Sequence, residues 1–276
     1  MIPRATTTVV LLALVILPGA CGSAGHATVR PPVTPTTQAV TPTTQAVTPT
    51  AQHFVGTQTV GALFPPGSSV HTCTASVVDS TAGDLLITAA HCVSGTARGY
   101  TFAPGYHAGI EPFGSWTVVG AYGAAEWLAG QAAQSDFAFL AVAPHQVNGR
   151  PEQIQEVTGG NQFGTAPASG DQVTVPAYAL GSNDDPVTCT TRVYYAGAYP
   201  AFNCDPYADG TSGAPWLQQS HHGWVVVGVI GGFHQGGCHT WTSYSAAFGP
   251  VTMRTYSEAA TAGKASRFPS AGSDGC

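Results

Sequence analysis

Charged side chains are scarce in this sequence. Only 8% of its 276 residues are charged, and eight Lys and Arg against fourteen Asp and Glu leave a formal net charge of −6. Proteins that bind nucleic acid gather Lys and Arg into a basic patch or stripe, so this charge balance argues against a nucleic-acid partner. No glycine pair is followed by a helical pattern, so the sequence lacks a phosphate-binding loop and predicts no cofactor.

Long stretches of helix-favouring residues are missing as well. Short segments rich in Val, Thr, Tyr and Phe are separated by turn-forming residues, among them 34 Gly and 21 Pro. This pattern predicts many short strands and an all-β fold of the barrel or sandwich type. Near-helical spacing of Ala, Glu, Met and Arg predicts one short C-terminal helix over Thr252–Ala262. The predicted strands are Cys73–Val78, Leu85–Ala89, Trp116–Ala121, Phe137–Val142, Gln172–Ala179, Thr188–Tyr195 and Trp224–Ile230.

The apolar run near the N-terminus, Val9–Leu17, is too short to cross a bilayer as a helix. It follows the positive charge of Arg4 and precedes the small residues Pro18–Ala20, so residues 1–20 are predicted to be an export signal. Cleavage before Cys21 would resemble a bacterial lipoprotein signal, although such signals usually carry an aliphatic residue at the position of Pro18. Two destinations stay open: secretion, or attachment to the outer face of the cell membrane through a lipidated Cys21.

A seven-residue unit, VTPTTQA, repeats nearly three times over residues 33–52. Each unit contains a proline, which rules out a coiled coil despite the heptad period. Residues 21–52 are therefore predicted to be an extended Thr/Pro-rich linker. The folded domain is expected over residues 53–262, and the Gly- and Ser-containing residues 263–276 are expected to be a flexible tail.

Seven cysteines fit an oxidising compartment. Without Cys21, six remain, which allows three disulfides in fifteen connectivities. Cys73 and Cys92 are predicted to pair, because two antiparallel strands would bring them within bridging distance. Two alternatives stay open for Cys204, which pairs with Cys189 or with Cys238, and Cys276 is left free. His234, Cys238 and His239 have a metal-like spacing, but the disulfide context argues against zinc, and no metal is predicted.

Three short segments carry the residue types of nucleophilic catalysis. His91 stands in TAAHC after an apolar strand, Asp136 stands in SDFAFL at the start of another, and Ser212 stands in the small-residue turn DGTSGAP. A carboxylate next to an apolar strand is partly desolvated and needs a partner such as an imidazole N–H. Taken singly, each segment is more often structural: a satisfied histidine, a turn cap and an ordinary turn.

Together, and in the order His, Asp, Ser, these segments resemble the trypsin-like (chymotrypsin-like) serine peptidases of the bacterial secreted type. The resemblance covers roughly residues 55–260 and implies two packed six-stranded antiparallel barrels with the active site in the cleft between them. It implies that His91 is the general base, that Asp136 orients it and that Ser212 is the nucleophile. The backbone N–H groups of Gly210 and Ser212 would then bind the oxyanion.

The implied function is a secreted serine endopeptidase that acts on protein or peptide substrates through an acyl-enzyme intermediate. The alternative is a catalytically silent, protease-shaped binding module displayed on the cell surface. A lesser alternative is an esterase that uses the same three residues.

The sequence departs from the family at two positions. Thr211 stands where many members carry an Asp that pairs with a new N-terminus, so we expect maturation to need no such ion pair. Pro206 stands where trypsin-like members carry an acid, so cleavage after Arg or Lys is not supported. The predicted substrate pocket includes Pro206, Gly231, Gly232 and Phe233, with the glycines leaving an open wall along which an extended substrate would pair.

Overall fold

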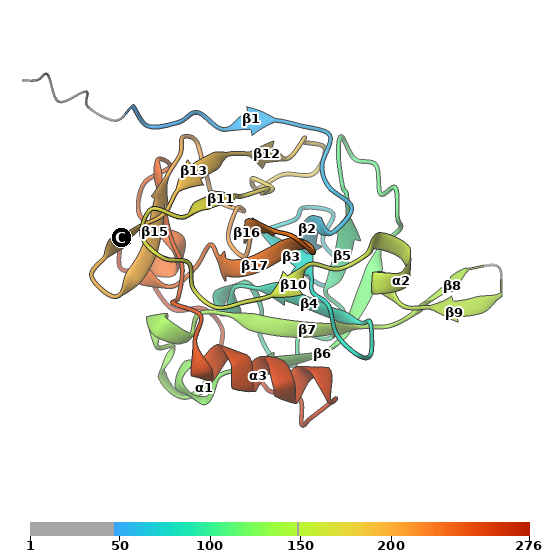
Figure 1. The fold of residues 1–276 in the computed structure, drawn as a ribbon. Coiled ribbons are helices and arrows are strands. Elements are labelled where there is room, and N and C mark those ends of the chain that lie inside the picture. Colours follow the sequence, from blue (N-terminus) through green and yellow to red (C-terminus); the bar gives the residue numbers. More distant parts are fainter. Residues whose placement is uncertain (1–46, 148) are drawn as a thin grey trace, which may run out of the picture. The chain divides into compact units, whose positions relative to one another are not determined.

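Six antiparallel strands close into a barrel in the first half of the chain (Figure 1). The computed structural model describes residues 47–147 and 149–276. Around the barrel the strands pair in the order β2-β3-β4-β7-β6-β5. Their bounds are β2 (Val60–Phe64), β3 (Cys73–Val77), β4 (Leu85–Thr88), β5 (Thr101–Pro104), β6 (Trp116–Gly123) and β7 (Ala138–Val142).

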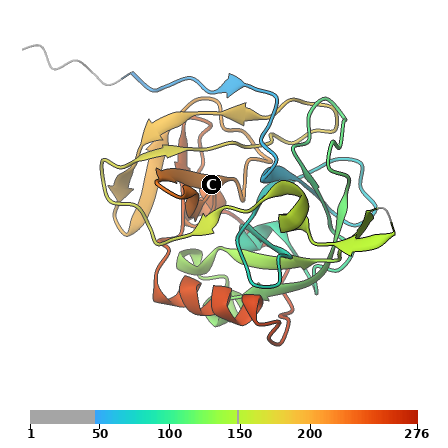
Figure 2. The same ribbon diagram turned by 45° about the vertical axis from the view of Figure 1, so that its right-hand side comes forward.

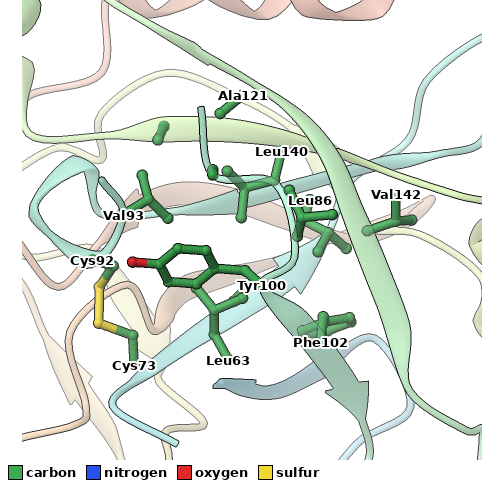
Figure 3. Packing of buried hydrophobic residues seen from close by; sticks show 14 of the residues in the cluster. Leu63, Cys73, Leu86, Cys92, Val93, Tyr100, Phe102, Ala121, Leu140 and Val142 are labelled. Carbon is green, nitrogen blue, oxygen red and sulfur yellow. A yellow bond between two sulfur atoms is a disulfide. The ribbon is translucent and has the colours of Figure 1, made fainter. Parts of the chain in front are cut away.

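Both faces of this barrel are covered, which explains why several of its strands are continuously apolar. Leu86 of β4 and Leu140 of β7 belong to the cluster that fills the barrel. Figure 3 shows this cluster, with the ring of Tyr100 among the aliphatic side chains. Leu85 and Phe139, one position away along the same strands, belong to a second buried cluster on the other face. Successive side chains of a strand point to opposite faces, so two covered faces require apolar residues at both.

Two larger sheets are found in the second half of the described chain. A five-stranded sheet has the order β10-β17-β16-β11-β13, and a three-stranded sheet has the order β14-β15-β18. Trp216 and Phe202, one from each sheet, are buried against each other with ring centroids 5.0 Å apart. The bounds are β10 (Gln162–Phe163), β11 (Gln172–Thr174), β13 (Thr190–Arg192), β14 (Tyr194–Ala196), β15 (Tyr199–Asn203), β16 (Pro215–Ser220), β17 (Gly223–Val229) and β18 (Thr242–Tyr244). The predicted all-β fold is confirmed, and within the described residues one continuous ring of paired strands is found in the first half.

The predicted C-terminal helix is confirmed as α3 (Pro250–Ala260), two residues earlier than expected. Figures 1 and 2 show it lying along the outside of the barrel beside β6 and β7. Proline at its first position suits a helix start, because the first N–H groups of a helix have no partner within it. Tyr256 stacks on Phe163 with ring centroids 4.9 Å apart, which joins the helix to β10 of the five-stranded sheet.

The remaining elements are short. Two further strand pairs are β1 (Gln52–His53) with β12 (Val187–Thr188), and β8 (His145–Val147) with β9 (Arg150–Glu152). The other helical segments are η1 (Ala90–Cys92), α1 (Ala125–Gly130), η2 (Ala133–Ser135), α2 (Ile154–Thr158) and η3 (Phe233–Gly236). Among the described helices, none combines the length and apolar character needed to span a membrane.

The strand predictions differ most from the structure in the second half. The strand expected over Gln172–Ala179 ends at Thr174, and the one expected over Thr188–Tyr195 is divided among β12, β13 and β14. In the barrel, by contrast, four predicted strands agree with β3, β4, β6 and β7 to within two residues at each end.

The prediction that the linker extends to Gln52 is wrong. The amide of Ala51 donates to the carbonyl of Asp205 at 2.8 Å, and the amide of Asp205 donates to the carbonyl of Pro49 at 2.9 Å. Ala51 is buried, and β1 follows directly. Residues from Pro49 onward therefore belong to the folded unit. The predicted export signal, Cys21 and the repeats before residue 47 lie outside the described residues.

The prediction of a flexible tail over residues 263–276 is also wrong. The amide of Phe268 donates to the carbonyl of Gly95 at 2.6 Å, and the amide of Ser266 donates to the carbonyl of Ala121 at 2.7 Å. The Phe268 ring is buried in the barrel cluster, next to Gly123, where a side chain would overlap it. This segment therefore packs against the barrel and contributes Phe268 to its core cluster.

Three disulfides are present within the described residues. Cys73–Cys92 and Cys189–Cys204 agree with the predicted pair and with the first of the two alternatives. The third is Cys238–Cys276, so the pairing of Cys238 with Cys204 and the free Cys276 were both wrong. This third disulfide forms because the tail docks on the barrel at Phe268 and then returns to the segment that carries Cys238.

We predict that Phe268→Ala lowers the free energy of unfolding by about 3–5 kcal/mol, because the substitution leaves a cavity in the barrel cluster. Chemical denaturation followed by tryptophan fluorescence measures this. Met253→Ala on the exposed face of α3 is the control and should cost less than about 0.5 kcal/mol. Equal effects for the two variants would contradict a structural role for the tail.

Candidate active site

The predicted base lies at the end of a barrel strand. β4 ends at Thr88, and the short helical turn η1 then carries His91. Cys92, the next residue, is bonded to Cys73 of the neighbouring strand β3 with Cα atoms 6.1 Å apart. The disulfide and the buried Ala90 hold this turn on both sides of the histidine.

The predicted orienting carboxylate is buried and fully engaged. Asp136 has no exposed surface. Its Oδ2 lies 2.8 Å from the Nδ1 of His91, and its Oδ1 accepts the backbone N–H of His91 at 3.0 Å. The backbone N–H of Gly232 also donates to Oδ2, at 2.8 Å. These hydrogen bonds offset the cost of burying a carboxylate. Because an ionised carboxylate only accepts, the hydrogen of the imidazole sits on Nδ1, which leaves Nε2 able to accept a proton.

The strand register explains why these two residues meet. η2 ends just before Asp136, and β7 follows it. Thr88 of β4 pairs with Ala138 of β7, so both strands bring their histidine and aspartate to the same edge of the barrel. The sequence motifs TAAHC and SDFAFL are therefore brought together as predicted.

The turn around Ser212 packs directly on the first barrel. The carbonyl of Ser212 accepts the backbone N–H of Thr74 of β3 at 2.8 Å. Gly213 has φ +79°, and a side chain there would overlap the hydroxyl of Thr88 and the carbonyl of Thr74. Only glycine permits both this backbone conformation and this close approach.

Ser212 and His91 line one cavity of about 540 Å³. Among the described residues, no hydrogen bond joins the Ser212 hydroxyl to the His91 ring. Such bonds are often long in unliganded enzymes and tighten when substrate binds. The backbone N–H groups of Gly210 and Ser212 also donate to no acceptor within the described part of the chain. The geometry thus places an oriented imidazole, a hydroxyl and two unpaired amides around a common space.

Most of the remaining cavity wall comes from three segments. These are residues 207–212, residues 234–240 and two residues of the C-terminal tail, Asp274 and Cys276. Burial raises the pKa of Tyr207, so its phenol stays neutral, and its hydroxyl donates to the carbonyl of Val175. Tyr207 is thereby anchored between the cavity and the core of the second half.

Of the residues predicted to form the substrate pocket, Pro206, Gly231, Gly232 and Phe233, none lines the 540 Å³ cavity, and their role in binding substrate stays a prediction. The amide of Gly231 donates to the carbonyl of Tyr244, the amide of Gly232 is taken by Asp136, and η3 then turns the chain away from an extended path. Gly232 lines a separate cavity of about 90 Å³.

Sequence reasoning missed the wall segment that follows these glycines. His234 and Gln235 line the cavity and are tied to the tail: His234 Nδ1 lies 2.8 Å from the carbonyl oxygen of Asp274, and Gln235 donates to the carbonyl of Gly272 at 2.9 Å. The even number of cysteines after Cys21 was the one available signal, because it required a partner for Cys276.

The ring of His234 lies near Cys238 and Cys276, within 4.8 Å between their ligand atoms. A cysteine binds metal as a thiolate, and both sulfurs are in a disulfide here. This cluster therefore offers one imidazole rather than the ligand set of a zinc site.

The chain was compared with family models and with solved structures, and both comparisons find peptidases. The model of the trypsin-like peptidase domain matches residues 73–229. The crystal structure of protease Anisep from Arthrobacter nicotinovorans superposes with a TM-score of 0.64 at 23% identity, over 76% of this chain and 99% of its own. The thermostable serine protease AL20 from an extremophilic microorganism gives 0.63 at 20% identity, over 74% and 98%. A Glu endopeptidase gives 0.59 at 16% identity, over 77% and 97%. At these identities the solved structures show the fold, and no curated protein matches the chain.

We predict that Gly213→Ala is far more damaging than Gly197→Ala. Both positions have positive φ, at +79° and +62°, but nothing lies within 4 Å of a side chain added at Gly197. Backbone strain alone should therefore cost about 1–2 kcal/mol of unfolding free energy at Gly197. The overlap with β3 and β4 should add about 1–3 kcal/mol at Gly213. Chemical denaturation compares the two variants, and equal losses would contradict the tight docking of the turn.

Proposed function

The chain belongs to the trypsin-like peptidase family, and from this premise we propose that it is an exported serine endopeptidase acting through Ser212, His91 and Asp136. The observation that carries the proposal is the hydrogen bond between the His91 ring and the buried Asp136, beside the cavity that Ser212 also lines. Three disulfides support an oxidising destination.

A serine hydroxyl is too weak an acid to attack an amide unaided at neutral pH. Nε2 of His91 takes the proton of Ser212 as its oxygen bonds to the carbonyl carbon of the substrate. The imidazolium then gives that proton to the departing amine, the C–N bond breaks, and an acyl-enzyme remains. A water molecule then hydrolyses the acyl-enzyme. Nε2 of His91 takes a proton from the water as its oxygen bonds to the acyl carbon, the ester bond to Ser212 breaks, and the imidazolium returns the proton to the Ser212 oxygen.

Asp136 holds the ring in the tautomer that this cycle needs and stabilises the imidazolium. The negative oxygen of the tetrahedral intermediate would be met by the backbone N–H groups of Gly210 and Ser212, which no other described group engages. Loss of one such donor typically slows an enzyme about 10²–10³-fold. Gly210 suits this role because a side chain there would overlap the backbone of Ala179 and Leu180.

The N-terminal sequence supports export and leaves attachment through Cys21 open. The apolar run within residues 1–20 supports export, and a lipid on Cys21 would tether the enzyme to the outer face of the cell membrane through the repeats. In either case the substrate would be a protein or peptide outside the cytoplasm.

We predict that a fluorophosphonate probe labels Ser212 and that labelling is lost in Ser212→Ala and His91→Ala. His222→Ala, in an exposed turn, is the matched control and should label like the wild type. Asp136→Asn should lower kcat about 10⁴-fold, because the amide no longer selects the reactive tautomer. Gel fluorescence and casein hydrolysis measure these effects. A well-folded protein that no probe labels would instead support the silent binding module.

We predict that activation requires no free N-terminus in the interior. Thr211 carries no charge, and its hydroxyl donates to the carbonyl of Ala208 at 2.7 Å, so no carboxylate there awaits an ammonium group. A mature chain beginning at Val47 should therefore keep its kcat when one or two residues are added before it. Shortening the chain to begin at His53 should lower thermal stability, because it removes the buried side chain of Ala51. Loss of activity on simple extension would contradict the prediction.

A further inference from the structure

A second histidine–carboxylate pair lies away from the residues discussed so far. Nε2 of His71 is 2.8 Å from Oδ1 of Asp184, across 113 positions of sequence. The His71 side chain is fully buried, and that of Asp184 is 29% exposed. A buried polar pair of this kind is costly to leave unpaired, so each partner holds the other in place.

Aromatic rings enclose His71. Those of Phe64, Tyr106 and Tyr178 meet it edge-on, with centroids 5.4, 5.4 and 5.9 Å away. Burial, and then the charge of Asp184, raises the pKa of Tyr178, so this phenol stays neutral. Among the three rings and Asp184, the carboxylate is the group that pairs with His71.

The pair fastens the loop of residues 178–184 to the segment that leads into β3. The backbone N–H of His71 donates to the carbonyl of Gly181 at 3.0 Å, and the hydroxyl of Tyr106 donates to the carbonyl of Ser182. At the other end of the loop, Tyr178 donates its backbone N–H to the hydroxyl of Thr74 at 2.9 Å.

This loop in turn sets one peptide of the nucleophile turn. The backbone N–H of Leu180 donates to the carbonyl of Asp209 at 2.6 Å. A trans peptide is planar, with its C=O and N–H pointing in opposite directions. Holding the Asp209 carbonyl toward Leu180 therefore turns the N–H of Gly210 away from the loop, to the side of the cavity that Gly210 lines.

We propose that the His71–Asp184 pair is a positioning device that holds the 178–184 loop against the Asp209–Gly210 peptide and so keeps the Gly210 amide aimed at the substrate carbonyl. The inference rests on the proposed peptidase function. It gives the oxyanion site an internal support made of two side chains, in a chain whose Thr211 offers no charge for an N-terminal ion pair. His71 and Asp184 touch no reacting atom and act through Leu180.

The test compares Asp184→Ala with Asp185→Ala, a neighbouring carboxylate that is exposed and outside the pair. We expect Asp184→Ala to lower kcat on a peptide substrate about 10²-fold, as for a lost oxyanion donor, with KM changed less than about threefold. Asp184→Asn keeps an oxygen that accepts the His71 N–H and should restore most of kcat. Asp185→Ala should match the wild type.

Hydrogen exchange supplies a readout that does not depend on activity. In Asp184→Ala we expect faster exchange in peptides covering 178–184 and 207–212, and unchanged exchange in β4 and β7. Unchanged kcat and unchanged exchange in a folded Asp184→Ala would overturn the proposal, as would a loss of protection spread through the whole molecule. If Asp184→Ala does not fold, His71→Phe decides, because it keeps a ring among the aromatic side chains but has no N–H to pair with Asp184. Wild-type exchange and kcat in His71→Phe would overturn the proposal. An inactive wild type with these exchange changes would instead refute the peptidase function and leave the loop support standing.

Discussion

One buried carboxylate connects the two halves of this molecule. Asp136 accepts hydrogen bonds from the ring and backbone of His91 in the first barrel and from the backbone of Gly232 in the second half. A buried carboxylate needs hydrogen-bond donors in place of water. The packing of the two halves around Asp136 must therefore bring the backbone N–H groups of His91 and Gly232 to it. The turn that carries Ser212 contacts the barrel from the other side, through Thr74 and Gly213. The spacing between imidazole and hydroxyl thus follows from how the halves pack.

The sequence predicted those parts of the site that local patterns specify. His91, Asp136 and Ser212 each sit in a short segment whose small or apolar neighbours define a strand end or a turn, and the structure brings the first two into contact and the third to the same cavity. The barrel strands were also predictable, because a strand covered on both faces is a continuous apolar run. The disulfide between Cys73 and Cys92 follows from the pairing of such strands.

The wall of the 540 Å³ cavity and the C-terminal tail were not predictable in this way. They depend on single backbone hydrogen bonds between distant residues, such as Phe268 with Gly95 and Gly231 with Tyr244, which leave no period in the sequence. The glycines at 231 and 232 permit an extended path and a tight turn equally well. Their conformation was decided by the carboxylate of Asp136 and by η3, which no local pattern reveals.

The disulfide that closes the C-terminal tail decides what a cut in the tail would do. Residues 261–265 are exposed, so they offer a site for nicking by this enzyme or another. A break there would release nothing, since Cys276 stays bonded to Cys238 and Phe268 stays in the core cluster of the barrel. Nicked and intact molecules would migrate together on a gel until a thiol reagent was added, when the short peptide would separate.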